Sequence, residues 1–375
     1  MITHWLCPDL LFDGQTLRKG MALGVAADRI STLAPVDGLP ADARRHAISG
    51  TITPGFLDLQ VNGGSDVFLN TTPTVAGMAA IAAAHRRFGT VGILPTLITD
   101  APEVLDQAAQ AALDAKGQTG ILGLHIEGPH ISLARRGTHA ARYLRPLDTR
   151  TIDIVRSLRA ARIAVMITLA PEAVSQGQIA ILAALGAVVS IGHSDATSEA
   201  TRACLAEGAT CFTHLYNAMS PMQGRAPGVT GTAINASAYC GIICDGIHVA
   251  DEMVALALRA RPKPDTTFLV SDAMPTVGGA DHFTLYGNEI RLVDGRLINS
   301  EGSLAGAHVT MAESVRRLIT VIGIDPAQAL RMAVAVPARV IGADHLAVVQ
   351  GRSLDDLLIL DADWRMTGTC AALPV

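Results

Sequence analysis

The chain has 375 residues, of which 49% are hydrophobic and 17% charged, and its formal net charge is -5. This composition is typical of a large α/β protein, and the negative charge argues against a nucleic-acid partner. Six cysteines occur without a CxxC pair, which excludes a zinc ribbon and a disulfide framework. The sequence has neither a signal peptide nor a membrane-spanning run, so we expect a soluble, cytoplasmic protein with no membrane partner.

Both ends of the chain predict β-structure. Residues 1–50 alternate apolar and polar side chains, with turn signals at Asp13-Gly14 and Asp37-Gly38, which favours short antiparallel strands. Residues 354–370, LDDLLILDADWRMTGTC, have the same character. We expect residues 1–50 and 338–375 to pair into a small β-sandwich domain.

The middle of the chain, residues 51–337, alternates strand-like and helix-like segments. Eight apolar runs recur, namely TITPGFLDLQ, TVGILPTLIT, GILGLHIE, RIAVMITLA, AVVSIGH, ATCFTH, YCGIICDG and TTFLVSD. Helical patterns such as VAGMAAIAAAHRRFG, PEVLDQAAQAALDA and SEATRACLAEG lie between them. This order predicts a (β/α)8 barrel of the TIM type. A doubly wound sheet is the competitor, but no GxGxxG follows the first strand. A hairpin is expected as an insertion near residues 283–300, turning at Asp294-Gly295.

Ionisable residues end five of the eight runs: Glu127, His193, His214, Asp245 with His248, and Asp272. The carboxyl ends of barrel strands meet at one mouth, so these groups should converge there. Glu127, His193 and His214 form a His2Glu set suited to zinc, which would make a water acidic, and Asp272 could accept its proton. Each histidine alone could instead be a hydrogen-bonded core residue, and Asp272 could cap a helix or sit in a turn.

Several motifs in fixed order strengthen this reading. GFLDLQVNGG, GLHIEGPHISLARRGTHAARYLR, SIGHSDAT, FTHLYNAMSPMQGRAPGVTG, ICDGIHV, LVSDAMP and SLAGAHVTMAESVRRLI together resemble the N-acetylglucosamine-6-phosphate deacetylases of the amidohydrolase superfamily. The resemblance covers essentially the whole chain. It implies hydrolysis of the acetamide of N-acetylglucosamine 6-phosphate, with one divalent metal per subunit. Zinc is favoured, although Fe²⁺, Mn²⁺ or Co²⁺ would be tolerated.

The resemblance also assigns individual residues. It implies metal ligands at Glu127, His193 and His214, and Asp272 as the catalytic acid and base. It places His139 near the acetyl carbonyl. The expected contacts to the sugar phosphate are Thr138, His139, Asn217, Ala218, Arg225, His248, Leu304, Ala305 and Gly306, and we add Asp245 from the strand that leads to His248. It further implies a homodimer, and leaves open which subunit supplies Arg225 to a given site.

Gln60 and Asn62 stand where two-metal amidohydrolases carry His-x-His. Neutral amides are poor zinc ligands, so we expect one tightly held metal, with these amides orienting Asp272 or the catalytic water. The alternatives are an N-acetylgalactosamine-6-phosphate deacetylase, another amidohydrolase, or an inactive sugar-phosphate binding protein. Arg225 and His248 argue against an uncharged substrate, since they suit a phosphate.

Overall fold

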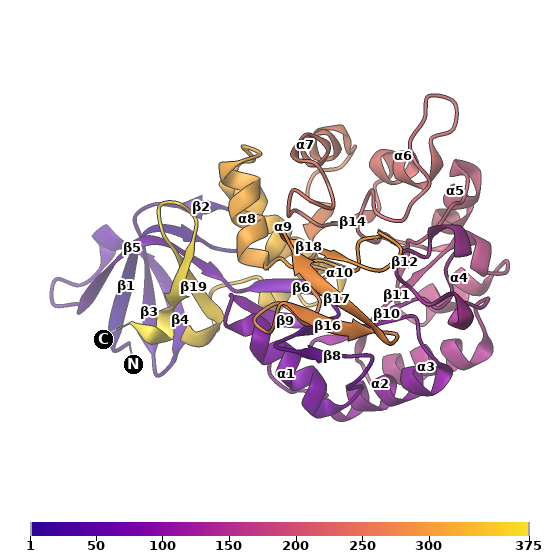
Figure 1. Ribbon diagram of the computed structural model, residues 1–375. Coiled ribbons are helices and arrows are strands. Elements are labelled where there is room, and N and C mark those ends of the chain that lie inside the picture. Colours follow the sequence, from indigo (N-terminus) through magenta and orange to yellow (C-terminus); the bar gives the residue numbers. More distant parts are fainter. Residues whose placement is uncertain (1, 374–375) are drawn as a thin grey trace.

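A barrel of eight parallel strands forms the centre of the computed structural model, which describes residues 2–373 (Figure 1). The strands are, in spatial order, β15 (Thr267–Leu269), β14 (Tyr239–Ile242), β13 (Cys211–Phe212), β12 (Val188–Ile191), β11 (Ala164–Leu169), β10 (Gly123–Glu127), β9 (Thr90–Ile98) and β6 (Phe56–Val61). The barrel closes between β15 and β6, the first and last strands of this order. There the backbone nitrogen of Asp272, which follows β15, donates to the carbonyl oxygen of Gln60 on β6 at 2.9 Å. All eight predicted runs contribute a strand, and the barrel prediction is confirmed.

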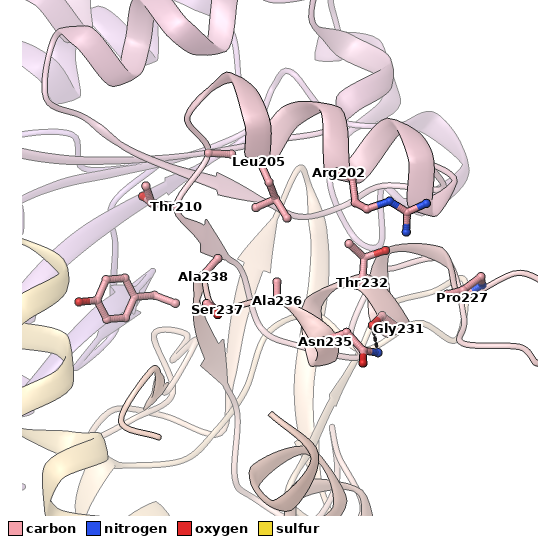
Figure 2. A pocket seen from close by; sticks show the side chains of 12 residues that line it. Arg202, Leu205, Thr210, Pro227, Gly231, Thr232, Asn235, Ala236, Ser237 and Ala238 are labelled. Carbon is pink, nitrogen blue, oxygen red and sulfur yellow. Dashed lines mark hydrogen bonds between the residues drawn. The ribbon is translucent and has the colours of Figure 1, made fainter. Parts of the chain in front are cut away.

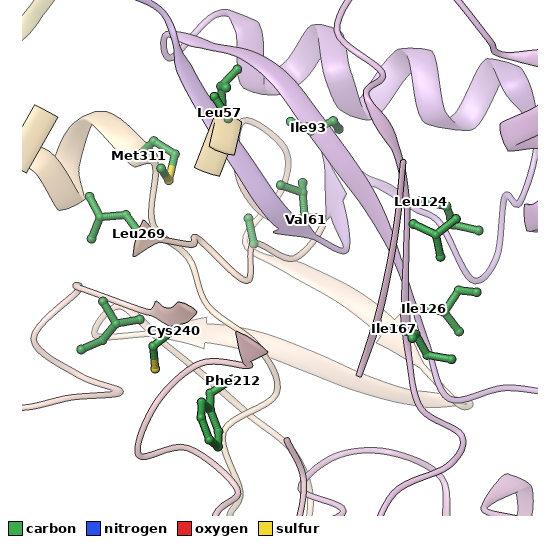
Figure 3. Close-up of a cluster of buried hydrophobic side chains, with 14 of the residues drawn as sticks. Leu57, Val61, Ile93, Leu124, Ile126, Ile167, Phe212, Cys240, Leu269 and Met311 are labelled. Carbon is green, nitrogen blue, oxygen red and sulfur yellow. The ribbon is translucent and has the colours of Figure 1, made fainter. Parts of the chain in front are cut away.

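Helices surround the barrel and bury the outer side of each strand. They are α1 (Val75–Arg86), α2 (Pro102–Asp114), α3 (Thr149–Ala160), α4 (Gln178–Ala184), α5 (Ser198–Glu207), α6 (Gly228–Asn235), α7 (Asp251–Ala260), α8 (Met311–Thr320), α9 (Pro326–Ala333) and α10 (Ala335–Val340). On β10, Leu124 and Ile126 belong to the large apolar cluster that the helices cover (Figure 3). Side chains alternate along a strand, so Glu127 lies on the opposite, inward side.

The two ends of the chain build one sheet beside the barrel (Figure 1). Its strands are β1 (His4–Phe12), β2 (Leu17–Arg18), β3 (Met21–Ala26), β4 (Arg29–Pro35), β5 (Arg45–Pro54), β19 (Leu357–Leu360) and β20 (Met366–Thr369). The expected terminal β-structure is confirmed, but β1 and β5 pair in parallel rather than antiparallel. The run TITPGFLDLQ is divided, because its first four residues complete β5 before Phe56 begins the barrel.

An inserted sheet follows β15. It has three antiparallel strands, β16 (His282–Leu285), β17 (Asn288–Val293) and β18 (Arg296–Ile298), where a two-stranded hairpin was expected. The turn at Asp294-Gly295 was predicted, whereas the one at Tyr286-Gly287 was not. The expected domain limit at residue 338 falls within α10 and stays a prediction. Short elements complete the described chain: β7 (Gly63–Gly64), β8 (Val67–Phe68) and single 3-10 turns at Val36–Gly38, Leu133–Arg135, Ala141–Tyr143, Pro171–Ala173, Asp344–Leu346, Leu354–Asp356 and Cys370–Ala372.

Candidate active site

Three of the predicted site residues follow barrel strands in an unusual backbone conformation. His193, His214 and Asp272 have φ angles of 48°, 30° and 51°. Left-handed backbone at residues other than glycine is costly and concentrates at functional sites, where the surrounding fold enforces it. Asp272 does not start a helix, because Ala273 forms isolated bridges with Val61 and Ala307 and the next described helix is α8, so the helix-cap alternative is wrong.

Glu127, His193 and His214 converge on one point at the barrel mouth. Oε1 of Glu127 lies 3.1 Å from Nε2 of His193 and 3.1 Å from Nε2 of His214, and the two Nε2 atoms are 3.0 Å apart. All three side chains are at most 5% exposed. Two imidazole nitrogens and a carboxylate oxygen at this spacing are a donor set suited to a divalent cation.

The tautomer of His193 supports this use. Its Nδ1 lies 2.9 Å from the carbonyl oxygen of Arg135, which can only accept, so Nδ1 carries the proton. The lone pair of Nε2 therefore faces Glu127 and His214, as a metal ligand requires. Nδ1 of His214 is buried without a partner among the described residues. The residues fit a divalent metal.

Gln60 and Asn62 contact the carboxylate of Asp272. Nδ2 of Asn62 donates to Oδ1 of Asp272 at 2.7 Å. Nε2 of Gln60 lies 3.2 Å from the same oxygen and 3.0 Å from Oε1 of Glu127. Burial, together with the nearby charge of Glu127, raises the pKa of Asp272 to about 6. A carboxyl group with this pKa can both take and return a proton near neutral pH.

His139 stands beside His193, with ring centroids 4.4 Å apart. A nitrogen of its ring lies within 4.8 Å of ligand atoms of Glu127 and His193, so it could form an alternative triad. We favour His214 as the third ligand, since its Nε2 lies 3.1 Å from Oε1 of Glu127 and 3.0 Å from Nε2 of His193. Nδ1 of His139 accepts from the backbone nitrogen of Thr99 at 3.4 Å and lies 2.7 Å from its hydroxyl. Accepting at Nδ1 leaves the proton on Nε2, which makes His139 a hydrogen-bond donor.

A cavity of about 500 Å³ opens beside these groups. Seven predicted residues line it, namely His214, Asn217, Ala218, His248, Asp272, Leu304 and Gly306. Asp245 instead orients His248, since its Oδ2 lies 2.6 Å from Nδ1 of that ring.

The remaining predicted contacts lie elsewhere. Thr138 lines a neighbouring cavity beneath the inserted sheet, and Ala305 is fully buried. Arg225 is exposed on the loop before α6 and is not among the residues that line the cavity.

Some cavity residues had no signal in the sequence. Arg135, Arg136 and Ser303 line it, and Arg136 forms an ion pair of 2.5 Å with Glu301 beside the inserted sheet. An arginine doublet in a loop is equally typical of an exposed surface, so only the fold reveals that it borders the site.

A second cavity, of about 620 Å³, lies on the outer wall of the barrel between α5 and α6 (Figure 2). Its walls are largely apolar, and they include Arg202 but no carboxylate or histidine. It lacks the carboxylate and imidazole donors that converge at the barrel mouth, so the candidate active site is placed at the mouth.

A parallel barrel with carboxylate and imidazole groups at its strand ends is suited to metal-assisted hydrolysis. The chain belongs to the Amidohydrolase family, which matches residues 51–365. It is 39% identical to an N-acetylgalactosamine-6-phosphate deacetylase from Shewanella sp. (strain ANA-3), covering 85% of this chain and 81% of that protein. It is 32% identical to an N-acetylglucosamine-6-phosphate deacetylase from Haemophilus influenzae, covering 85% and 84%.

Solved structures agree. An N-acetylglucosamine-6-phosphate deacetylase from Pasteurella multocida is similar with a TM-score of 0.89 at 32% identity, covering 98% of this chain and 97% of that chain. A variant of the Mycobacterium smegmatis enzyme, in complex with N-acetyl-D-glucosamine-6-phosphate, has a TM-score of 0.87 at 30% identity, covering 98% and 97%. The family resemblance drawn from the sequence is confirmed. None of the described helices is long and apolar enough to cross a membrane.

Proposed function

We propose that the protein hydrolyses the acetamide of N-acetylglucosamine 6-phosphate to glucosamine 6-phosphate and acetate. The observation that carries this proposal is the buried Glu127-His193-His214 set close to Asp272, beside a cavity that His214, Asp272 and His248 line. Such an arrangement supplies a metal position, a proton carrier and a polar group for an anionic substrate within one site.

Glu127, His193 and His214 would hold one divalent cation, with zinc preferred. When bound, the cation would lower the pKa of a water molecule toward neutrality. Gln60 and Asn62 supply N–H groups to carboxylates, which suits hydrogen bonding to Asp272 and Glu127 rather than metal coordination. We therefore propose that each chain binds one cation.

Asp272 then carries the proton. Its carboxylate accepts a proton from the attacking water, and the protonated group delivers it to the amide nitrogen as the C–N bond breaks. His139 donates a hydrogen bond from Nε2 to the acetyl oxygen, where negative charge develops. Burial holds the pKa of His139 well below its usual value, so the ring acts as a neutral donor.

We assign binding of the substrate's phosphate group to His248 and Arg225. His248 lines the cavity, held by Asp245, whereas Arg225 stands exposed on its loop. An exposed loop arginine outside the cavity of its own chain is suited to reach a neighbouring subunit. We therefore propose a homodimer in which Arg225 binds the phosphate in the partner's site.

N-acetylgalactosamine 6-phosphate is the second candidate substrate, favoured by the 39% identity to a deacetylase named for it. The two sugars differ in the orientation of one hydroxyl group. Acetate release from both 6-phosphates and from the two unphosphorylated sugars tests both assignments. We expect kcat/KM to be highest for N-acetylglucosamine 6-phosphate and at least about a hundredfold lower without phosphate, the loss of two or three charged hydrogen bonds. Equal rates with and without phosphate would overturn the proposal.

A further inference from the structure

A third cavity, of about 320 Å³, lies on the flank of the barrel, and it shares no lining residue with the active site. It is bounded by the end of α1, the loop after β15, the start of α8, and β20. Its lining residues are Arg87, Phe88, Val277, Gly278, His308, Val309, Thr310, Ala312, Glu313, Arg316, Arg365 and Met366.

Positive charge dominates this flank cavity. Three arginines against the single carboxylate of Glu313 give a lining charge of 3 - 1 = +2, in a chain whose formal net charge is -5. Oε2 of Glu313 is already engaged, because it accepts from the backbone nitrogen and the hydroxyl of Thr310 at 2.8 Å each. The start of α8 is thus capped by its own side chains. Arg365 pairs with Asp363 at 2.7 Å, so Arg87 and Arg316 are the charges that remain for a ligand.

Two of these arginines have no acidic partner among residues 2–373. Arg87 donates from Nη2 to two neutral oxygens, the hydroxyl of Ser65 at 2.5 Å and the carbonyl of Gly278 at 3.1 Å. Arg316 has no ion pair in the described chain, and its Nε is buried without any hydrogen-bond partner. A buried charged donor without an acceptor is costly, so an anion in the cavity would remove a penalty as well as add an attraction.

We propose that the flank cavity binds a phosphate monoester. A monoester carries a charge close to -2 at neutral pH, which matches the lining charge of +2, and guanidinium groups suit its oxygens. Phe88, Val277 and Met366 offer apolar walls to the body of the ligand. A volume of about 320 Å³ is at the small end of ligand sites and fits a compound of monosaccharide size.

Inorganic phosphate is the probe for the test, titrated calorimetrically into the metal-loaded full-length protein. The wild type should show a binding event that the Arg87→Gln/Arg316→Gln variant loses, or retains with a Kd at least about tenfold higher. The matched control Arg18→Gln/Arg156→Gln removes two exposed, ion-paired arginines elsewhere and the same net charge. It should bind phosphate as the wild type does, so the loss cannot come from net charge.

Deacetylation without added phosphate should proceed at the wild-type rate in the Arg87→Gln/Arg316→Gln variant, which shows that it folds. Should that variant fail to fold, Arg365→Gln replaces it, since Arg365 is exposed and its loss should still weaken binding severalfold. Identical phosphate binding in the wild type and in the folded cavity variant would overturn the proposal, as would an equal loss in the control.

Discussion

Nε2 of Gln60 lies 3.2 Å from Oδ1 of Asp272 and 3.0 Å from Oε1 of Glu127, so one amide group bridges two buried carboxylates. Like charges this close repel, and the amide hydrogens offset part of that repulsion. In a two-metal site, a second cation would offset this repulsion instead. The amide therefore allows the two carboxylates to lie close together without a second cation between them, as the proposed one-metal site requires.

Removing this bridge should impair chemistry more than metal binding. Gln60→Leu leaves both carboxylates without the donor, and we expect kcat to fall about 10- to 100-fold, as for loss of a hydrogen bond to a charged group. Metal content, measured on the same sample, should fall less than kcat, because Glu127 keeps its contacts with His193 and His214. Gln110→Leu, which alters an exposed glutamine on α2, is the control. Wild-type kcat in Gln60→Leu would show that the bridge has no catalytic consequence.

Asp272→Asn tests the proton carrier. Asparagine has nearly the same shape but cannot take a proton from water, so turnover should fall at least about 10²- to 10⁴-fold. Metal content, measured on the same sample, should be unchanged because Asp272 is outside the ligand set. Asp281→Asn, an exposed aspartate in the same region, should keep full activity. Turnover near normal in Asp272→Asn would remove the assignment.

Glu172 should act on the metal site at a distance. Its carboxylate accepts from the hydroxyl of Ser194 at 2.8 Å and from the backbone nitrogen of Asp195 at 2.6 Å. Asp195 pairs with Arg135, whose carbonyl fixes the tautomer of His193. Glu172→Ala should therefore weaken metal binding roughly 10- to 100-fold, measured by competition with a chelator.

The control for this change is Glu199→Ala, which removes an exposed carboxylate on α5 that pairs with Arg202 and accepts from the hydroxyl of Ser198. It should bind metal as the wild type does. Equal metal affinity in Glu172→Ala and Glu199→Ala would contradict the positioning role.

His85 should make the stability of the fold depend on pH. Burial lowers the pKa of this histidine to about 4, and its Nε2 lies 2.9 Å from the carbonyl of Gly63. In the unfolded chain the ring titrates near its ordinary value of 6.5. The buried neutral ring contributes fully to stability above pH 6.5, and this contribution is lost as the pH falls toward 4. The resulting decrease in the free energy of unfolding is on the order of 3 kcal/mol.

His85→Gln keeps a donor for Gly63 but does not titrate. The difference in Tm between the two proteins should therefore shift in favour of the variant between pH 7.5 and pH 4.5. Parallel Tm curves over this range would rule out His85 as a source of acid sensitivity.

Much of the fold was predictable because buried parallel strands appear in the sequence as short apolar runs that recur between helical patterns. The position of Glu127, His193 and His214 followed from their places at strand ends, since the barrel brings such ends to one mouth. Other features depend on contacts that no local pattern specifies. The parallel pairing of β1 and β5, the bridge from Gln60 to Glu127, and the chain from Glu172 to His193 join segments far apart in the sequence.

Arg225, by contrast, was predicted from the sequence but is not explained by the fold of one chain. Its motif, GRAPG, predicted a phosphate contact, yet within one chain the side chain is exposed and is not among the residues that line the cavity. A role that depends on a second subunit cannot be placed by the fold of a single chain. Thr138 and Ala305 are adjacent in sequence to cavity residues, but Thr138 lines the cavity beneath the inserted sheet and Ala305 is fully buried.

The number of divalent metal ions per catalytically active chain, determined by elemental analysis of the dialysed protein, tests the central claim most directly. Glu127, His193 and His214 provide one complete ligand set, whereas Gln60 and Asn62 are engaged with carboxylates. The expected stoichiometry is close to one. A value near two, with both ions tightly held, would contradict the account.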